Sequence, residues 1–94
     1  MDLSQLRCEI DKIDDELVQL FVQRMGLAAQ VADYKKENHL PILAPARERE
    51  KLQDVAVKAG PEMADYTRVL YSMLFELSRS YQGKRNHTQT ALYY

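Results

Sequence analysis

The sequence is poor in residues that interrupt helices and in residues that cross-link chains. Its 94 residues include three glycines, three prolines, one cysteine and no tryptophan. Scarce glycine and proline favour a mostly helical chain, because both residues disfavour helix interiors. The single cysteine, Cys8, excludes an internal disulfide and fits a reducing compartment, so we expect a cytoplasmic protein.

Other absences exclude whole classes of protein. No apolar run approaches the ~20 residues that cross a bilayer, and the polar start MDLSQLRCEID is unlike a signal peptide. The net charge of −1 offers no general attraction to nucleic acid or to a membrane surface. His39 and His87 have no Cys, Asp or Glu cluster at metal-binding spacing, so the residues give no reason to expect a metal site.

The sequence does contain strong helical periodicity. Apolar residues recur in steps of three and four, which predicts one helix over about residues 3–37, capped by Asp2 or Ser4. This apolar stripe consists of Leu3, Leu6, Ile10, Ile13, Leu17, Leu20, Leu27, Val31 and Tyr34. Two shorter helices follow, one within residues 44–60 and one within residues 61–83. The sequence therefore predicts an all-α protein with three helices per chain.

Proline and glycine mark the expected ends of the shorter helices. Pro45 suits the first turn of the second helix, and Gly60 suits its end. Gly83 is expected to end the third helix. We expect residues 84–94 to be a flexible tail or a linker cut from a longer protein.

The length of the first helix predicts a dimer. At ~1.5 Å per residue the helix would be roughly 50 Å long, whereas a compact monomer of this size has a radius of gyration of ~12 Å. Its apolar stripe would then be exposed over several turns, which soluble monomers avoid. We therefore expect an intertwined homodimer with a long first helix.

Arg24 interrupts the stripe, in the position between Leu20 and Leu27. An unpartnered buried guanidinium is costly, so the stripe is open to water there, Arg24 forms an internal salt bridge, or an anion binds it. Lys35 lies on the same face roughly 16 Å further on, so both side chains could reach one small molecule. Arg7 lies roughly 25 Å away and is rotated by ~100°, so it could join that site only from a partner chain.

The remaining polar candidates are ordinary when each is taken alone. Arg47 and Glu48 open the second helix, in a charged run of a kind that is usually a solvated face. Ser78 and Gln82 lie one turn apart on the third helix, a common surface arrangement.

Taken together, these blocks resemble the all-helical chorismate mutases of the AroQ class, especially the short bacterial type. The resemblance covers about residues 3–82 and includes LRCEIDKIDDELVQLFVQR, the lysine near the end of the first helix, REREK and SRSYQ. Members of this family are intertwined dimers of three-helix subunits. They convert chorismate to prephenate, on the route to phenylalanine and tyrosine, without metal or cofactor. The resemblance implies a mutase domain over residues 1–83, either free-standing or fused to a prephenate dehydratase.

The resemblance also implies a role for each polar candidate. Arg24 and the partner's Arg7 would bind the two carboxylates of chorismate, with Arg47 as a further cation close by. Lys35 would reach a carboxylate and the ether oxygen, and Gln82 would donate to that oxygen. Glu48 would accept a hydrogen bond from the ring hydroxyl, and Ser78 would help to hold a carboxylate. Ala44 departs from several relatives, which have an aspartate at this position.

Two other functions fit the same sequence features. Isochorismate-pyruvate lyases are similar in fold and also bind a dianion, although the pair Glu48 and Gln82 favours the mutase. A non-catalytic dimerisation or regulatory module would explain the amphipathic helices, but not the polar residues at family positions. An assay with both substrates separates these alternatives.

Overall fold

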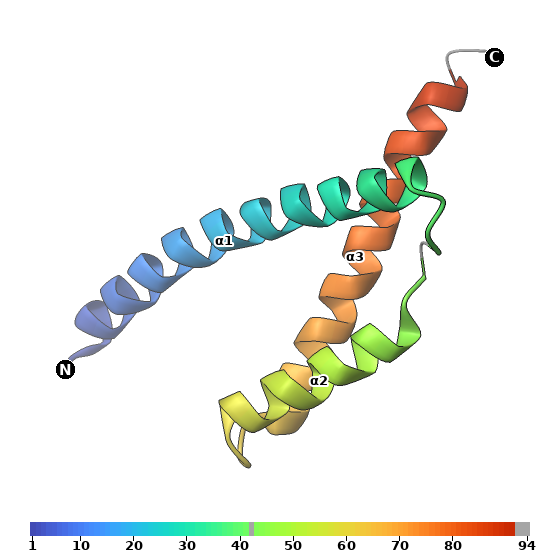
Figure 1. Cartoon of the computed structure of the whole chain (residues 1–94). Helices are drawn as coiled ribbons and strands as arrows, with labels where there is room; N and C mark the ends of the chain where they lie inside the picture. Colours follow the sequence, from blue (N-terminus) through green and yellow to red (C-terminus); the bar gives the residue numbers. More distant parts are fainter. Residues whose placement is uncertain (42, 92–94) are drawn as a thin grey trace.

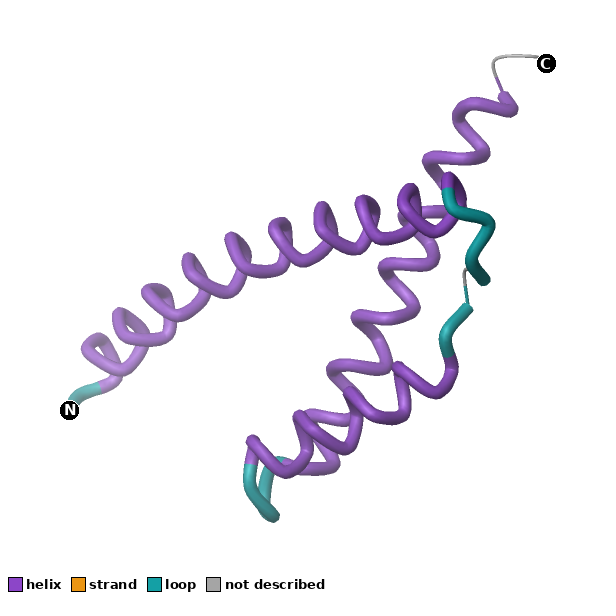
Figure 2. The backbone as a smooth tube through the Cα atoms, in the orientation of Figure 1, coloured by secondary structure: helices purple, strands orange, loops and turns teal. Residues whose placement is uncertain are grey.

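Three helices make up the chain (Figure 1). The computed structural model describes residues 1–41 and 43–91, excluding the side chains of residues 86–91. The helices are α1 (Leu3–Glu37), α2 (Pro45–Ala59) and α3 (Ala64–Ala91). No strand occurs within the described ranges, which are helix and loop throughout (Figure 2). The prediction of an all-α chain with three helices is confirmed.

The start of α1 is fixed by a reciprocal cap. The side chain of Asp2 accepts the backbone N–H of Gln5 at 2.8 Å, and the side chain of Gln5 accepts the backbone N–H of Asp2 at 2.9 Å. These two bonds satisfy backbone donors that have no partner inside the helix. Lys35 and Lys36 lie in the last turn, where the helix dipole favours positive charge. Helix α1 runs from Leu3 to Glu37, so its predicted bounds, about residues 3–37, are confirmed.

Proline and glycine also delimit α2 as predicted. Pro45 is its first residue, where a missing backbone N–H costs nothing because the first turn has no partner for it. Gly60 follows the helix with a φ of 86°, a conformation that residues with a Cβ rarely adopt.

The end of α3 differs from the prediction. Gly83 does not end the helix, which continues to Ala91. A glycine inside a helix costs only about 1 kcal/mol relative to alanine, and the next turn gains a tertiary contact. The Arg85 guanidinium reaches Asp33 on α1 at 3.1 Å. Residues 92–94 of the predicted tail lie outside the described residues.

The helices form an open arrangement with little interior. Helix α3 packs against both α1 and α2, whereas α1 and α2 do not pack against each other in the described chain. Buried apolar residues there are limited to Ala29, Val55 and Ala56. The accessible surface is 8003 Å², against about 5,600 Å² expected for a compact monomer of this mass.

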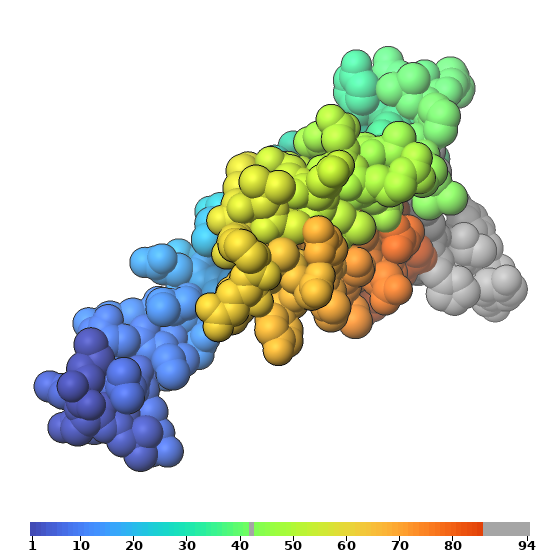
Figure 3. All heavy atoms as spheres, turned by 90° about the horizontal axis from the view of Figure 1, so that it is seen from below, coloured from blue at the N-terminus to red at the C-terminus, as the bar shows by residue number. Residues whose placement is uncertain are grey.

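The N-terminal half of α1 extends away from the other helices (Figures 1 and 3). The radius of gyration is 17.0 Å and the longest extent is 56 Å. Along this half the stripe is open to solvent; Ile13, for example, is 62% exposed. The prediction that α1 projects beyond its own core is confirmed.

Candidate functional site

Three of the predicted site residues line one pocket where α1 crosses α3. Lys35 enters it from the last turns of α1, and Ser78 and Gln82 enter it from successive turns of α3. The remaining lining residues are Ala28, Val31, Ala32 and Arg79. The small side chains of α1 leave a cavity of about 120 Å³ between the helices.

The hydroxyl of Ser78 is engaged within its own helix. Its Oγ donates to the carbonyl oxygen of Leu74 at 2.9 Å and lies 3.7 Å from the sulfur of Met25. A hydroxyl has one hydrogen and two lone pairs. In this rotamer Leu74 accepts the hydroxyl hydrogen, so Ser78 must rotate to donate to a carboxylate.

Arg24 lies one turn before the pocket and rests on aromatic rings of α3. Its guanidinium carbon is 5.6 Å from the ring centre of Tyr71 and 5.7 Å from that of Phe75. Within the described residues it has no carboxylate partner, so the internal salt bridge considered for it is not formed. The side chain is half-buried and lines an otherwise apolar groove of about 460 Å³. A guanidinium that is held on aromatic rings and partly shielded from water is well placed to bind an anion.

Glu48 does not line the pocket, but it forms an ion pair with Arg79, which does. Arg79 was not singled out from the sequence. One Arg79 nitrogen lies 2.7 Å from each Glu48 carboxylate oxygen. The contact joins α2 to α3, and Arg79 also lines the pocket beside Ser78. No sequence spacing could have revealed this pair, since 31 residues separate its members.

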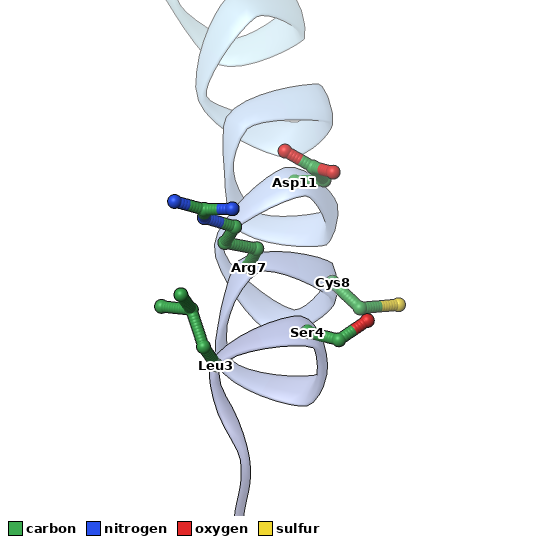
Figure 4. A pocket seen from close by; sticks show the side chains of 5 residues that line it. All are labelled: Leu3, Ser4, Arg7, Cys8 and Asp11. Atoms are coloured by element: carbon green, nitrogen blue, oxygen red, sulfur yellow. The ribbon is translucent and has the colours of Figure 1, made fainter.

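Arg47 and Arg7 are not brought to this pocket within one chain. The Arg47 side chain is 67% exposed, and its ion pair with Glu50 spans 4.0 Å. Arg7 lies near the far end of α1, in a shallow hollow lined only by residues of that helix (Figure 4). Its side chain projects from the helix beside Leu3. A single chain therefore assembles Lys35, Ser78 and Gln82, but not the two remaining arginines.

Gln82 has a cationic neighbour that was also missed. The Arg85 guanidinium donates to Oε1 of Gln82 at 3.4 Å and to Asp33 at 3.1 Å. It also lies over the Tyr81 ring, 5.8 Å from the ring centre. Sequence reasoning overlooked Arg85 because it placed the end of the helix at Gly83.

The charge around the pocket is mainly positive. Lys35 and Arg79 line it, Arg24 and Arg85 flank it, and the carboxylate of Glu48 approaches from α2. The described residues include no group of three or more His, Cys, Asp or Glu side chains placed to bind a metal ion. None of their helices is both long enough and apolar enough to cross a membrane. The arrangement is suited to binding and orienting a small anion that also carries a hydrogen-bond donor.

Known proteins from several organisms are similar in sequence to about half of this chain. A T-protein of Haemophilus influenzae is 51% identical over 51 residues, which are 54% of this chain and 14% of that protein. A bifunctional chorismate mutase/prephenate dehydratase of Aquifex aeolicus is 41% identical over 54 residues, 57% of this chain and 15% of that protein. A chorismate mutase of Methanocaldococcus jannaschii is 38% identical over 47 residues, 50% of this chain and 48% of that protein.

The chain thus spans about one seventh of the first two relatives and about half of the third. No solved structure matches it. The family profile of chorismate mutase type II matches residues 6–83, a range that includes every predicted site residue. The chain belongs to the chorismate mutase type II family.

Proposed function

We propose that this protein converts chorismate to prephenate, in the biosynthesis of phenylalanine and tyrosine. The observation that carries the proposal is the convergence of Lys35, Ser78 and Gln82 on one pocket. Arg24, which has no carboxylate partner among the described residues, lies one helical turn away. Chorismate is a dianion with one ether oxygen and one ring hydroxyl, and each of these groups has a counterpart around the pocket.

The reaction is an intramolecular rearrangement, so the protein needs neither a nucleophile nor a proton transfer. Its work is to hold a flexible substrate in a compact shape with the reacting carbons close together. Arginine suits this task because its guanidinium grips a carboxylate through two parallel hydrogen bonds. Fixing the reacting geometry removes an entropic part of the barrier.

Electrostatic stabilisation would supply the second part of the rate increase. Negative charge grows on the ether oxygen as its bond to carbon breaks. Lys35 and Gln82 would donate hydrogen bonds to this oxygen, more strongly in the transition state than in the ground state. Glu48, oriented by Arg79, would accept from the ring hydroxyl, and Ser78 would rotate away from Leu74 to contact a carboxylate. Arg47 would act as a further cation near the substrate.

The active form that we propose is an intertwined homodimer. The apolar stripe of α1 is 47–62% exposed at every position from Leu3 to Tyr34. Because about half of each side chain is already covered, burying the rest would contribute roughly half of the ~1.5–3 kcal/mol that full burial gives. One chain also encloses only about 120 Å³ around Lys35, whereas ligand pockets commonly hold about 300–1,000 Å³. A second copy would cover the stripe and close the site.

Dimer symmetry gives Arg7 its role. If two α1 helices pair in opposite directions about residues 15–16, midway between positions 7 and 24, the partner's Arg7 lies opposite Arg24. That centre falls within the stripe, between Ile13 and Leu17. The two arginines would then bind the two carboxylates of one substrate. A reducing, cytoplasmic location fits the exposed thiol of Cys8.

The test is the loss of chorismate absorbance with purified protein, run beside Arg24→Ala. We expect fast loss with prephenate as the product, and a decrease in kcat/KM on the order of 100-fold or more in the variant. A parallel assay with isochorismate identifies a lyase by release of pyruvate. A folded protein that consumes neither substrate would contradict the proposal.

A further inference from the structure

The turn of α3 beyond Gly83 carries an arginine that contacts Gln82, a residue of the pocket. Arg85 lies three residues after Gln82, and its guanidinium has three neighbours. It donates to Oε1 of Gln82 at 3.4 Å, pairs with Asp33 of α1 at 3.1 Å, and lies over the ring of Tyr81 at 5.8 Å. Its side chain is 35% exposed, less than that of Asp33 at 49%. These contacts hold a cation beside the oxygen end of one amide.

The two ends of that amide are not equivalent for the proposed reaction. Nε2 of Gln82 donates hydrogen bonds, whereas Oε1 only accepts them. With Oε1 turned toward the pocket, the amide would place a partial negative charge beside the substrate ether oxygen and oppose the reaction. Arg85 has five N–H donors and no acceptor, so it can bond only to Oε1.

We propose that Arg85, anchored by Asp33, is a positioning residue that orients the Gln82 amide so that Nε2 faces the substrate. The inference rests on the proposed function for its catalytic consequence, although the contact itself can be tested without activity. It also extends the functional unit beyond residue 83, where the sequence placed its end. Arg85 itself does not line the pocket, so it acts through Gln82.

The kinetic test compares Arg85→Met with Arg68→Met in the full chain. Methionine keeps a long, helix-favouring side chain but removes every donor. Arg68 is a matched control, because it too contacts an oxygen of the residue three positions before it on α3, the Asp65 carboxylate at 2.6 Å, but lies roughly 25 Å before Arg85 along the helix. We expect Arg85→Met to lower kcat by about tenfold with little change in KM, because the Gln82 contact acts mainly in the transition state. Arg85→Lys should recover part of the loss.

A pH profile separates orientation from simple support of the helix. In Gln82→Glu the side chain donates only when protonated, so the rate should fall as pH rises through its titration. The charged groups near position 82 are Lys35 and Asp33 from α1, Arg79 and Arg85 from α3, and Glu48 from α2 through Arg79. Removing Arg85 takes away a cation that favours the carboxylate. The midpoint for Gln82→Glu/Arg85→Met should therefore lie higher by about one pH unit than for Gln82→Glu.

A measurement without substrate keeps the inference independent of the proposed function. The side-chain N–H₂ resonances of Gln82, assigned by their loss in Gln82→Met, should shift in Arg85→Met and stay in place in Arg68→Met. Unchanged resonances would overturn the inference, whatever the protein catalyses. Shifted resonances without any chorismate conversion would retain the contact and reject the proposed function. Equal midpoints in the two Gln82→Glu backgrounds would also overturn it.

Discussion

The two halves of α1 share one apolar stripe but have different surroundings. The C-terminal half crosses α3 and contributes Lys35, Ala28 and Ala32 to a pocket, with Ala29 buried nearby. The N-terminal half extends away from the other helices, and its Ile10 and Ile13 are 55% and 62% exposed. The stripe is nevertheless exposed in both halves, since Leu27, Val31 and Tyr34 are 60%, 54% and 60% exposed. The halves differ in their packing on α3 and not in the exposure of the stripe. An exposed stripe of this length indicates that the missing contact comes from outside the chain.

The arginines repeat this contrast between the halves. Arg24 rests on Tyr71 and Phe75 and flanks the pocket, whereas Arg7 projects from a bare helix. In our account both bind the same substrate, one from each subunit. Each chain would thus contribute the N-terminal half of its α1 to the active site of its partner.

The largest expected effect comes from placing a charge on the bare half of the stripe. Ile13→Glu should dissociate the proposed dimer and abolish activity, because a buried, unpaired carboxylate is strongly unfavourable. Gln19→Glu adds the same charge about 120° around the helix from Ile13, off the stripe, and should leave both intact. Sedimentation velocity and the chorismate assay give the two readouts. If Ile13→Glu remains an active dimer, this half of the stripe does not form the interface.

A smaller effect is expected at the link between α2 and the pocket. Arg79→Met should lower kcat/KM by about tenfold, because Glu48 loses both hydrogen bonds that orient it. In a Glu48→Gln background the same change should add little, since partners of one contact are not independent. Additive losses in the steady-state kinetics of the double variant would mean that Arg79 acts directly on the substrate.

The start of α2 offers a modest gain in stability. Ala44 precedes this helix and makes no side-chain capping bond. Ala44→Asp should supply one and raise the unfolding free energy by about 1 kcal/mol, or the melting temperature by roughly 4–8 °C for a domain of this size. Thermal unfolding at equal protein concentration measures the change, and Ala46→Asp, placed inside the first turn, is a suitable comparison. An unchanged melting temperature would show that the loop before α2 cannot accept the cap.

The smallest expected effect is a near absence of pH dependence. Gln82 donates at any ordinary pH, so we expect kcat/KM to be nearly flat between about pH 5 and 8. A steep fall with rising pH would show that the donor to the ether oxygen is an acid, and would contradict the assignment of Gln82. Steady-state rates in buffers of constant ionic strength provide the profile.

Local features of the fold could be predicted from the sequence because they depend on neighbouring residues. Asp2, Pro45 and Gly60 mark helix ends through backbone chemistry within one turn. The prediction that α3 ends at Gly83 was wrong, because a glycine does not end a helix when the next turn gains a stabilising contact. Here Arg85 in that turn bonds to Asp33, which is 52 residues earlier in the sequence.

The site residues show the same difference between what depends on sequence pattern and what depends on how the helices pack. Lys35, Ser78 and Gln82 could be chosen because they matched a family pattern, and the structure brings them to one pocket. The pair of Glu48 and Arg79 could not be chosen, since it depends on how α2 lies against α3. Arg7 and Arg47 lie apart from the pocket in a single chain, so their roles remain proposals about the dimer.

The most direct test of a site shared between the two halves of α1 is subunit complementation. Arg7→Ala and Arg24→Ala chains, each inactive alone, are mixed under conditions where mass labels show that subunits exchange. One site in each heterodimer would contain both arginines, so about one quarter of the wild-type sites should return. Arg24→Ala mixed with Lys35→Ala is the control and should stay inactive, because both residues come from the same chain of a site. Proven exchange with no recovery in the first mixture would contradict the shared site.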